Sequence, residues 1–163
     1  MFKKILSGTV LGVVTLSSSW VSAADDARSS IHITANIPTK QFHVQPRDPE
    51  FGKNEFMYYN PVNKKLSPVR EMFDVKNTEG SVYAYLEGQS WLDNGKNQIV
   101  TVVQFNNVLL EHSPKEVVDD ATSTPGTTVE MHISAPFPIN PRQTGLYTAN
   151  FTVIFDAVPR VAL

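Results

Sequence analysis

The stretch GLYTANFTVIFD, residues 145–156, decides the fold class of this chain. Every second side chain is apolar, and the residues between them are mostly polar. This period-two alternation predicts a β-strand with one face in a core and the other face in water. The residues on the apolar face are Tyr147, Ala149, Phe151, Val153 and Phe155.

Shorter segments of the same kind precede this strand. Val, Ile, Thr, Tyr and Phe recur without helical periodicity, and 11 prolines punctuate the chain. A dense series of short strands separated by turn residues is typical of an all-β, immunoglobulin-like β-sandwich. We expect strands at residues 42–44, 55–60, 69–76, 81–87, 99–106 and 129–134.

Turn signals connect these segments. The residues Asn77-Thr78-Glu79-Gly80 separate two strands, 69–76 and 81–87, which are predicted to pair as a hairpin. Asp93-Asn94-Gly95 is a second turn signal. The polar stretch 113–126 is predicted to be a surface loop with one helical turn at residues 115–119.

The amino-terminal residues resemble a secretory signal peptide. Lys3 and Lys4 precede an apolar stretch, Ile5 to Leu16, which is far shorter than the roughly 20 residues of a membrane-spanning helix. Signal peptidase requires small side chains at the first and third positions before the cut. We therefore expect residues 1–23 to be removed by cleavage after Ala23, with Ala24 as the alternative, and the mature chain to be exported.

Composition excludes several classes of function. A net charge of −2 argues against a nucleic-acid-binding protein, and the absence of cysteine excludes thiolate metal sites and disulfides. None of the four histidines has the spacing of a metal ligand, and the pairs Asp25-Asp26 and Asp119-Asp120 lack the glycine-centred pattern of a calcium loop. No nucleophile elbow or phosphate-binding loop is present. We predict no catalytic residue, metal or cofactor.

A second alternating stretch, IHITANI at residues 31–37, lies close to the expected cleavage point. Its apolar side chains share one face, and Pro38 ends it because proline has no N–H to donate to a β-ladder. This segment is either the first strand of a self-contained sandwich or a strand that serves another molecule. The apolar side chains are Ile31, Ile33, Ala35 and Ile37.

The two ends of the mature chain resemble those of the colonisation-factor-antigen and coli-surface-antigen type fimbrial major subunits. Those proteins begin with an alternating Ile-x-Val-x-Ala-x-Val segment followed by proline, and residues 31–38 are similar to it. Their closing strand opens with Gly-x-Tyr, as does the strand that starts at Gly145. The similarity spans nearly all of the mature chain.

This resemblance implies a structural pilin of the alternate, alpha-class chaperone–usher pathway and no enzymatic activity. Residues 24–38 would be a donor-strand extension, and residues 39–163 an incomplete sandwich. A periplasmic chaperone would fill the missing strand first, and the extension of the next identical or related subunit would replace it at an outer-membrane usher. Ile31, Ile33, Ala35 and Ile37 would then enter a groove lined by the apolar face of residues 147–155. The product would be a surface fimbria that meets its host receptor through a tip adhesin.

The alternative function is that of a monomeric secreted, or fibre-tip, module that binds carbohydrate or protein. Aromatic side chains stack on sugars, although core filling is the commoner role of such residues in sandwiches. The candidates are Tyr58, Tyr59, Tyr83, Tyr85 and Trp91.

Overall fold

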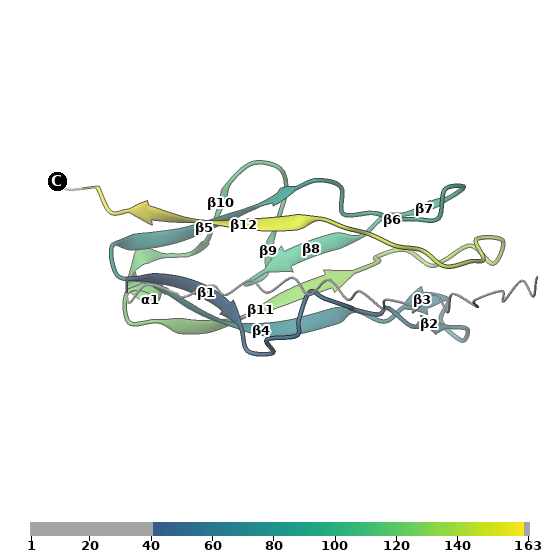
Figure 1. Cartoon of the computed structure of the whole chain (residues 1–163), viewed down its shortest axis with the longest axis horizontal. Coiled ribbons are helices and arrows are strands. Elements are labelled where there is room, and N and C mark those ends of the chain that lie inside the picture. The colour runs from purple at the N-terminus through teal and green to yellow at the C-terminus, as the bar shows by residue number, and fades with distance from the viewer. Residues whose placement is uncertain (1–40, 162–163) are drawn as a thin grey trace, which may run out of the picture. The chain divides into compact units, whose positions relative to one another are not determined.

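Two antiparallel sheets form the body of the protein (Figure 1). The computed structural model describes residues 41–161. The larger sheet has the strand order β1-β4-β11-β8-β9, and the smaller sheet has the order β10-β5-β12. The larger sheet contains β1 (Phe42–Pro46), β4 (Val69–Asn77), β11 (Thr127–Ser134), β8 (Val102–Phe105) and β9 (Val108–Leu109), and the smaller contains β10 (Lys115–Val118), β5 (Gly80–Glu87) and β12 (Thr152–Pro159).

Three smaller elements accompany the two sheets. The hairpin β2 (Tyr59–Asn60)–β3 (Lys65–Leu66) and the hairpin β6 (Leu92–Asp93)–β7 (Gln98–Ile99) form separate two-stranded ribbons. The helix α1 (Asp120–Ser123) is a single turn. The prediction of an all-β, immunoglobulin-like sandwich is confirmed. Within residues 41–161, no helix is long and apolar enough to cross a membrane.

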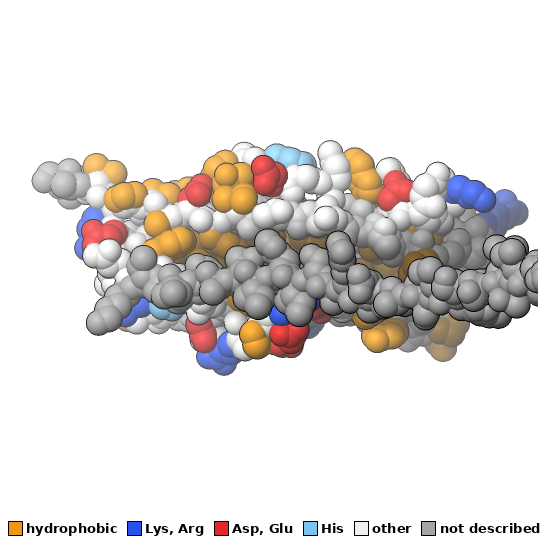
Figure 2. Space-filling model, viewed as in Figure 1, with side chains coloured by type: hydrophobic (Ala, Val, Ile, Leu, Met, Phe, Trp, Pro, Cys, Tyr) orange, Lys and Arg blue, Asp and Glu red, His pale blue; other side chains and the backbone are white. Residues whose placement is uncertain are grey.

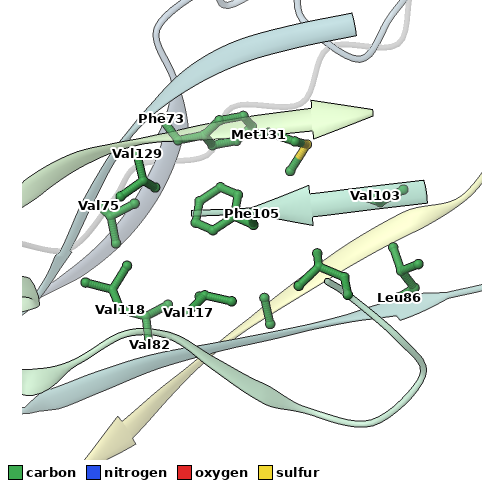
Figure 3. Close-up of a cluster of buried hydrophobic side chains, with 12 residues drawn as sticks. Phe73, Val75, Val82, Leu86, Val103, Phe105, Val117, Val118, Val129 and Met131 are labelled. Carbon is green, nitrogen blue, oxygen red and sulfur yellow. The ribbon is translucent and has the colours of Figure 1, made fainter. Parts of the chain in front are cut away.

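The core lies between the sheets and is built from the alternating faces of the long strands (Figure 3). Phe73 and Val75 of β4 face Val82 and Ala84 of β5, and none of the four is more than 5% exposed. Phe105 of β8 is fully buried at the centre. Its ring packs edge-on against that of Phe73, with 5.3 Å between the ring centroids. Because alternate residues of a strand point to opposite faces, β4, β5 and β11 each direct one face toward this cluster.

The predicted hairpin between residues 69–76 and 81–87 is wrong. β4 pairs with β1 and β11, whereas β5 pairs with β10 and β12, so the turn carries the chain from one sheet to the other. The buried Asn77 holds this crossing, because its Nδ2 donates to the Ser81 carbonyl at 2.8 Å and its Oδ1 accepts from the Glu79 N–H. Each strand buries a whole apolar face, and the two faces meet across the core instead of lying side by side.

The helical turn predicted at residues 115–119 is also wrong. This segment is strand β10, and the helical turn follows it as α1. Val117 and Val118 are both buried because the pairing of β10 with β5 shifts register between Glu116 and Val118, which turns two consecutive side chains inward. Asp119 then caps α1 by accepting from the Thr122 N–H at 2.8 Å.

The remaining strands differ from prediction mainly in length. The segment 55–60 contributes only β2, and the segment 99–106 is divided into β7 and β8 around the exposed Val100. The closing strand begins at Thr152 and not at Gly145. The turn predicted at residues 93–95 is confirmed: it joins β6 to β7, and Gly95 has a φ of 80° that favours glycine.

A second, smaller core lies beside the short hairpins. Ile99, Ala135 and Ile139 are buried there, and the half-buried side chains of Leu66, Leu92 and Tyr147 pack against them. Backbone hydrogen bonds join the same turns, from Ile139 N–H to the Lys64 carbonyl at 2.7 Å and between Asp93 and Thr148. The segment 145–151 therefore follows this cluster instead of extending β12.

The end of β12 is tied to the opposite turns by Arg160. Its guanidinium donates to both carboxylate oxygens of Asp120, at 2.7 and 3.0 Å, and to the Thr78 carbonyl at 3.1 Å. The hydrogen bonds from Arg160 and then from Thr124 hold the pKa of Asp120 below its ordinary value. The ion pair in turn raises the pKa of Arg160.

Gly80 is required at the start of β5 because no side chain fits there. A Cβ built on it would lie 2.1 Å from the Val158 carbonyl oxygen and 2.6 Å from the Arg160 nitrogen. We expect Gly80→Ala to lower the free energy of unfolding by about 1–3 kcal/mol, because backbone must move. Thermal unfolding of the purified protein measures this. Ser81→Ala, one residue on, is the control, and an equal effect of both substitutions would contradict the proposed clash.

The Arg160–Asp120 pair predicts a pH-dependent stability. Because the pKa of Asp120 is lowered on folding, its contribution is complete above its ordinary pKa of 3.8 and is lost as the pH falls through the lowered value. We expect Arg160→Ala to lower Tm at about pH 7, and we expect the effect to shrink as the pH falls below the ordinary pKa of 3.8 and Asp120 becomes protonated. The Tm of Arg160→Lys, which keeps the charge but not the bidentate geometry, should lie between those of the wild type and of Arg160→Ala. A gap in Tm that does not change with pH would exclude this role.

Candidate functional site

β12 is an edge strand of the smaller sheet, as β10 is on the opposite side of β5. β12 pairs with β5 along its whole length, from Thr152 opposite Glu87 to Pro159 opposite Gly80. No strand among residues 41–161 pairs with its other side. We call this side of β12 the open edge.

The hydrogen-bonding pattern identifies which backbone groups face the open edge. The Arg160 N–H donates to the Glu79 carbonyl at 2.8 Å, so this pair is hydrogen-bonded. Hydrogen-bonded and non-hydrogen-bonded pairs alternate in an antiparallel ladder. The even-numbered residues of β12 therefore bond to β5, and Val153, Phe155 and Ala157 direct their N–H and C=O groups away from it.

Two prolines agree with this assignment. Pro159 has the same parity as Ala157, so its missing N–H falls on the open edge. In β1, the Arg47 N–H donates to the Met72 carbonyl at 2.8 Å, which places the nitrogen of Pro46 on the side away from β4. Proline in a sheet is confined to positions whose N–H would not serve the ladder. Both strands are thus built as edges.

The edges of β1 and β12 lie on the same side of the sandwich. On the other side, the chain after β9 connects the two sheets: the Leu86 N–H of β5 donates to the Glu111 carbonyl, and Lys115 Nζ of β10 donates to the Leu109 carbonyl of β9. The order of strands in the two sheets then leaves β1 and β12 opposite this junction. Hydrophobic side chains reach the surface near β12 in Figure 2.

The core is less completely closed on this side than elsewhere. Phe151, Val153 and Phe155 pack against the main cluster but remain half-buried, whereas Val82 and Ala84 of the neighbouring β5 are fully buried. The centroid of the Phe155 ring lies 4.9 Å from that of Phe105 and 6.2 Å from that of Phe73. The apolar wall of the open edge is therefore continuous with the centre of the core.

The structure separates the five predicted groove residues. Phe151, Val153 and Phe155 lie along the open edge, Tyr147 packs in the second cluster, and Ala149 is exposed. The other predicted sites lie outside the described residues. These are the donor-strand positions Ile31, Ile33, Ala35 and Ile37 and the cleavage positions Ala23 and Ala24.

Sequence reasoning identified the apolar wall but not the backbone groups that accompany it. Val44 of β1 and Ala157 of β12 were missed, although Val44 packs on the core and its backbone has the parity that faces away from β4. The prolines at positions 46 and 159 carried this information, because each marks an unbonded N–H position in a strand.

No alternative chemical site is formed by the described residues. They contain no cluster of three potential metal ligands. Asp119 is occupied in capping α1 and Asp120 in binding Arg160. Two open hollows of about 240 and 370 Å³ are lined by polar and aliphatic residues. His43 and Asp74 both line the larger one, where the Asp74 carboxylate accepts hydrogen bonds from Arg47 and Thr128. Tyr83 and Tyr85 lie half-buried on the outer face of β5.

The comparison with protein families identifies the family of the chain. Residues 27–156 match the model of the CS1 type fimbrial major subunit. The chain belongs to this family. It is therefore a structural, non-enzymatic fimbrial subunit that assembles with other pilin subunits in a fimbria on the cell surface.

Other comparisons add little to this assignment. A solved structure of the CooA pilin subunit from enterotoxigenic Escherichia coli is 17% identical, with a TM-score of 0.49 over 69% of this chain and 86% of that one. None of the curated proteins compared with the chain matches it.

The open edge makes a prediction about two neighbouring positions. Ala157→Pro removes an N–H that faces the open edge, so the isolated subunit should keep a Tm close to that of the wild type. Val158→Pro removes an N–H that faces Ser81 of β5 and should cost about 1–3 kcal/mol. Thermal unfolding of both variants checks which N–H groups of β12 bond to β5 and which face the open edge. A larger loss for Ala157→Pro than for Val158→Pro would contradict it.

Proposed function

We propose that this pilin polymerises by donor-strand exchange, in which the amino-terminal segment of one subunit pairs with the open edge of another. The observation that carries the proposal is the coincidence, on β12, of outward backbone groups at Val153, Phe155 and Ala157 with a half-buried apolar wall. Strand addition at such an edge combines main-chain hydrogen bonds with side-chain burial. The interface is head-to-tail and does not close, so it generates a filament.

The segment 31–37 has the composition and length that this edge requires. Ile31 to Ile37 spans the same number of residues as Val153 to Pro159, about 20 Å in an extended strand. Its alternating apolar face would cover the wall, and each buried isoleucine would contribute about 1.5–3 kcal/mol. The polar His32, Thr34 and Asn36 would then face outward.

The open edge also gives a physical reason for a chaperone and an usher. An unpaired strand with an apolar wall is a site of aggregation unless another strand covers it. We propose that residues 1–23 direct export and are cleaved after Ala23 or Ala24, and that a periplasmic chaperone occupies the edge until an outer-membrane usher replaces it with residues 24–38 of the next subunit. Residues 39–163 would then form the sandwich domain, and a tip adhesin would contact the host receptor.

A pair of substitutions tests the donor segment. Ile33→Asp places a carboxylate in the apolar interface and should abolish polymer formation in cells that carry the assembly genes. Thr34→Asp, the matched control, adds the same charge on the outward face and should leave polymer formation intact. Electron microscopy and immunoblotting of surface extracts measure both. Fibres from Ile33→Asp in wild-type amount would exclude this segment as the donor.

Truncation separates the filament from a monomeric binding module. A mature chain that begins at Pro38 keeps the open edge but lacks the donor strand. It should therefore accept a strand from another subunit without extending the filament further. Continued polymerisation of the truncated chain would overturn the proposal, and glycan binding by the isolated monomer would support the alternative function.

A further inference from the structure

The two ends of the sandwich differ in charge. At one end lie the β4–β5 turn, α1 and the last residues of β12, held together by Arg160 and by the Ser123 hydroxyl, which donates to the Gly80 carbonyl. We call this the acidic end. It carries Glu79, Asp119 and Asp120, and Asp120 is paired with Arg160. The N-cap hydrogen bonds from Thr122 lower the pKa of Asp119, which keeps it ionised.

The other end gathers most of the cations that have no ion-pair partner among residues 41–161; Lys76, beside the β4–β5 turn, is the exception. The β2–β3 hairpin, the β6–β7 hairpin and the loop 139–146 meet there, joined by hydrogen bonds from Ile139 to Lys64 and from Asn94 Nδ2 to the Thr144 carbonyl. We call this the basic end (Figure 1). The exposed cations on these turns have no ion-pair partner among residues 41–161, and they are Lys64, Lys65, Lys96 and Arg142. Asp93 is the one carboxylate on these turns, so positive charge predominates at this end.

The basic end also carries most of the exposed apolar surface. Val62 is 91% exposed in the β2–β3 turn, Leu146 is 82% exposed and Phe137 is 65% exposed. Phe56 and Tyr58 precede β2. Their rings stack with 6.3 Å between the centroids, and each residue is more than half exposed. Apolar groups that gather on one surface and are rimmed by charge mark a protein-interaction site. The family of the chain identifies the available partner as another pilin subunit.

Chain continuity determines which end of a donating subunit reaches this surface. The Thr78 N–H donates to the Gln41 carbonyl at 2.8 Å, so the described chain begins at the acidic end. Only Thr39 and Lys40 separate Gln41 from the proposed donor segment, and an extended chain covers at most about 3.6 Å per residue. If residues 24–38 are the donor, as proposed above, the acidic end of the donating subunit must lie close to one end of the acceptor's open edge.

We propose that the acidic end of each subunit docks on the basic end of the subunit that accepts its strand, and that this contact is a second joint of the fibre. Two acidic ends would repel each other, whereas Glu79 and Asp119 complement the unpaired lysines of the basic end. The exposed apolar side chains of the basic end become covered by the second copy. The donated strand then runs antiparallel to β12, which begins near the basic end and finishes at Pro159.

Charge reversal followed by charge exchange tests this joint. Lys64→Glu with Lys96→Glu should slow polymer formation about tenfold at low salt, with a smaller defect near 1 M NaCl, where charges are screened. Adding Glu79→Lys and Ala121→Lys, which reverse the acidic end and leave the Asp119 cap in place, should restore the rate. Lys53→Glu, which breaks only an exposed ion pair with Glu50 away from both ends, is the control and should assemble at the wild-type rate.

The outcomes distinguish this inference from the donor-strand proposal. If the Lys64/Lys96 variant assembles at the wild-type rate at low salt while Ile33→Asp does not assemble, the end-to-end joint is overturned and the donor strand stands. If the variant is slow but the reversed acidic end fails to restore it, the pairing of these two ends is overturned. Polymerisation of Ile33→Asp would remove the donor strand, and rescue by exchanged charges would still support the contact between ends. Circular dichroism of each purified subunit confirms that it is folded.

Discussion

The structure depends on how the backbone hydrogen-bonding groups of β12 are satisfied. One half of them bond to β5, and the other half lie beside a wall of half-buried aromatic and aliphatic side chains. Unpaired N–H and C=O groups are costly when apolar surface surrounds them, so an edge of this kind favours contact with another strand. The same residues that complete the core of the subunit thus also form its open edge.

The sandwich is organised to keep this edge in place without a disulfide. Asn77 fixes the crossing between the sheets, Gly80 allows β12 to approach β5 closely, and Arg160 holds the end of β12 against α1. The central aromatic contacts among Phe73, Phe105 and Phe155 connect both sheets with the apolar wall. Packing and local hydrogen bonds therefore fulfil the role that disulfides have in many small exported domains.

Sequence periodicity predicted the class of fold and the faces of the long strands, because alternation directly reports which side chains can be buried together. It failed where tertiary context decides. Residues 69–76 and 81–87 have hairpin-like spacing, yet each buries an entire face, and only the three-dimensional core shows that these faces oppose each other. Val117 and Val118 are both buried because of a register shift that no periodic pattern encodes. Tyr147 and Phe151 continue one alternation, but a second cluster captures the tyrosine.

The one-sided pairing of β12 has a mechanical consequence for a fibre in which neighbours are joined by a strand laid along it. Tension applied through such a fibre would pull the two adjacent strands past each other lengthwise. All of the cross-strand bonds would then carry the load together in shear, and none could be peeled away first. Rupture would require the whole donated strand to slide along the apolar surface at once, so a joint made of individually weak contacts would resist the drag of flowing liquid.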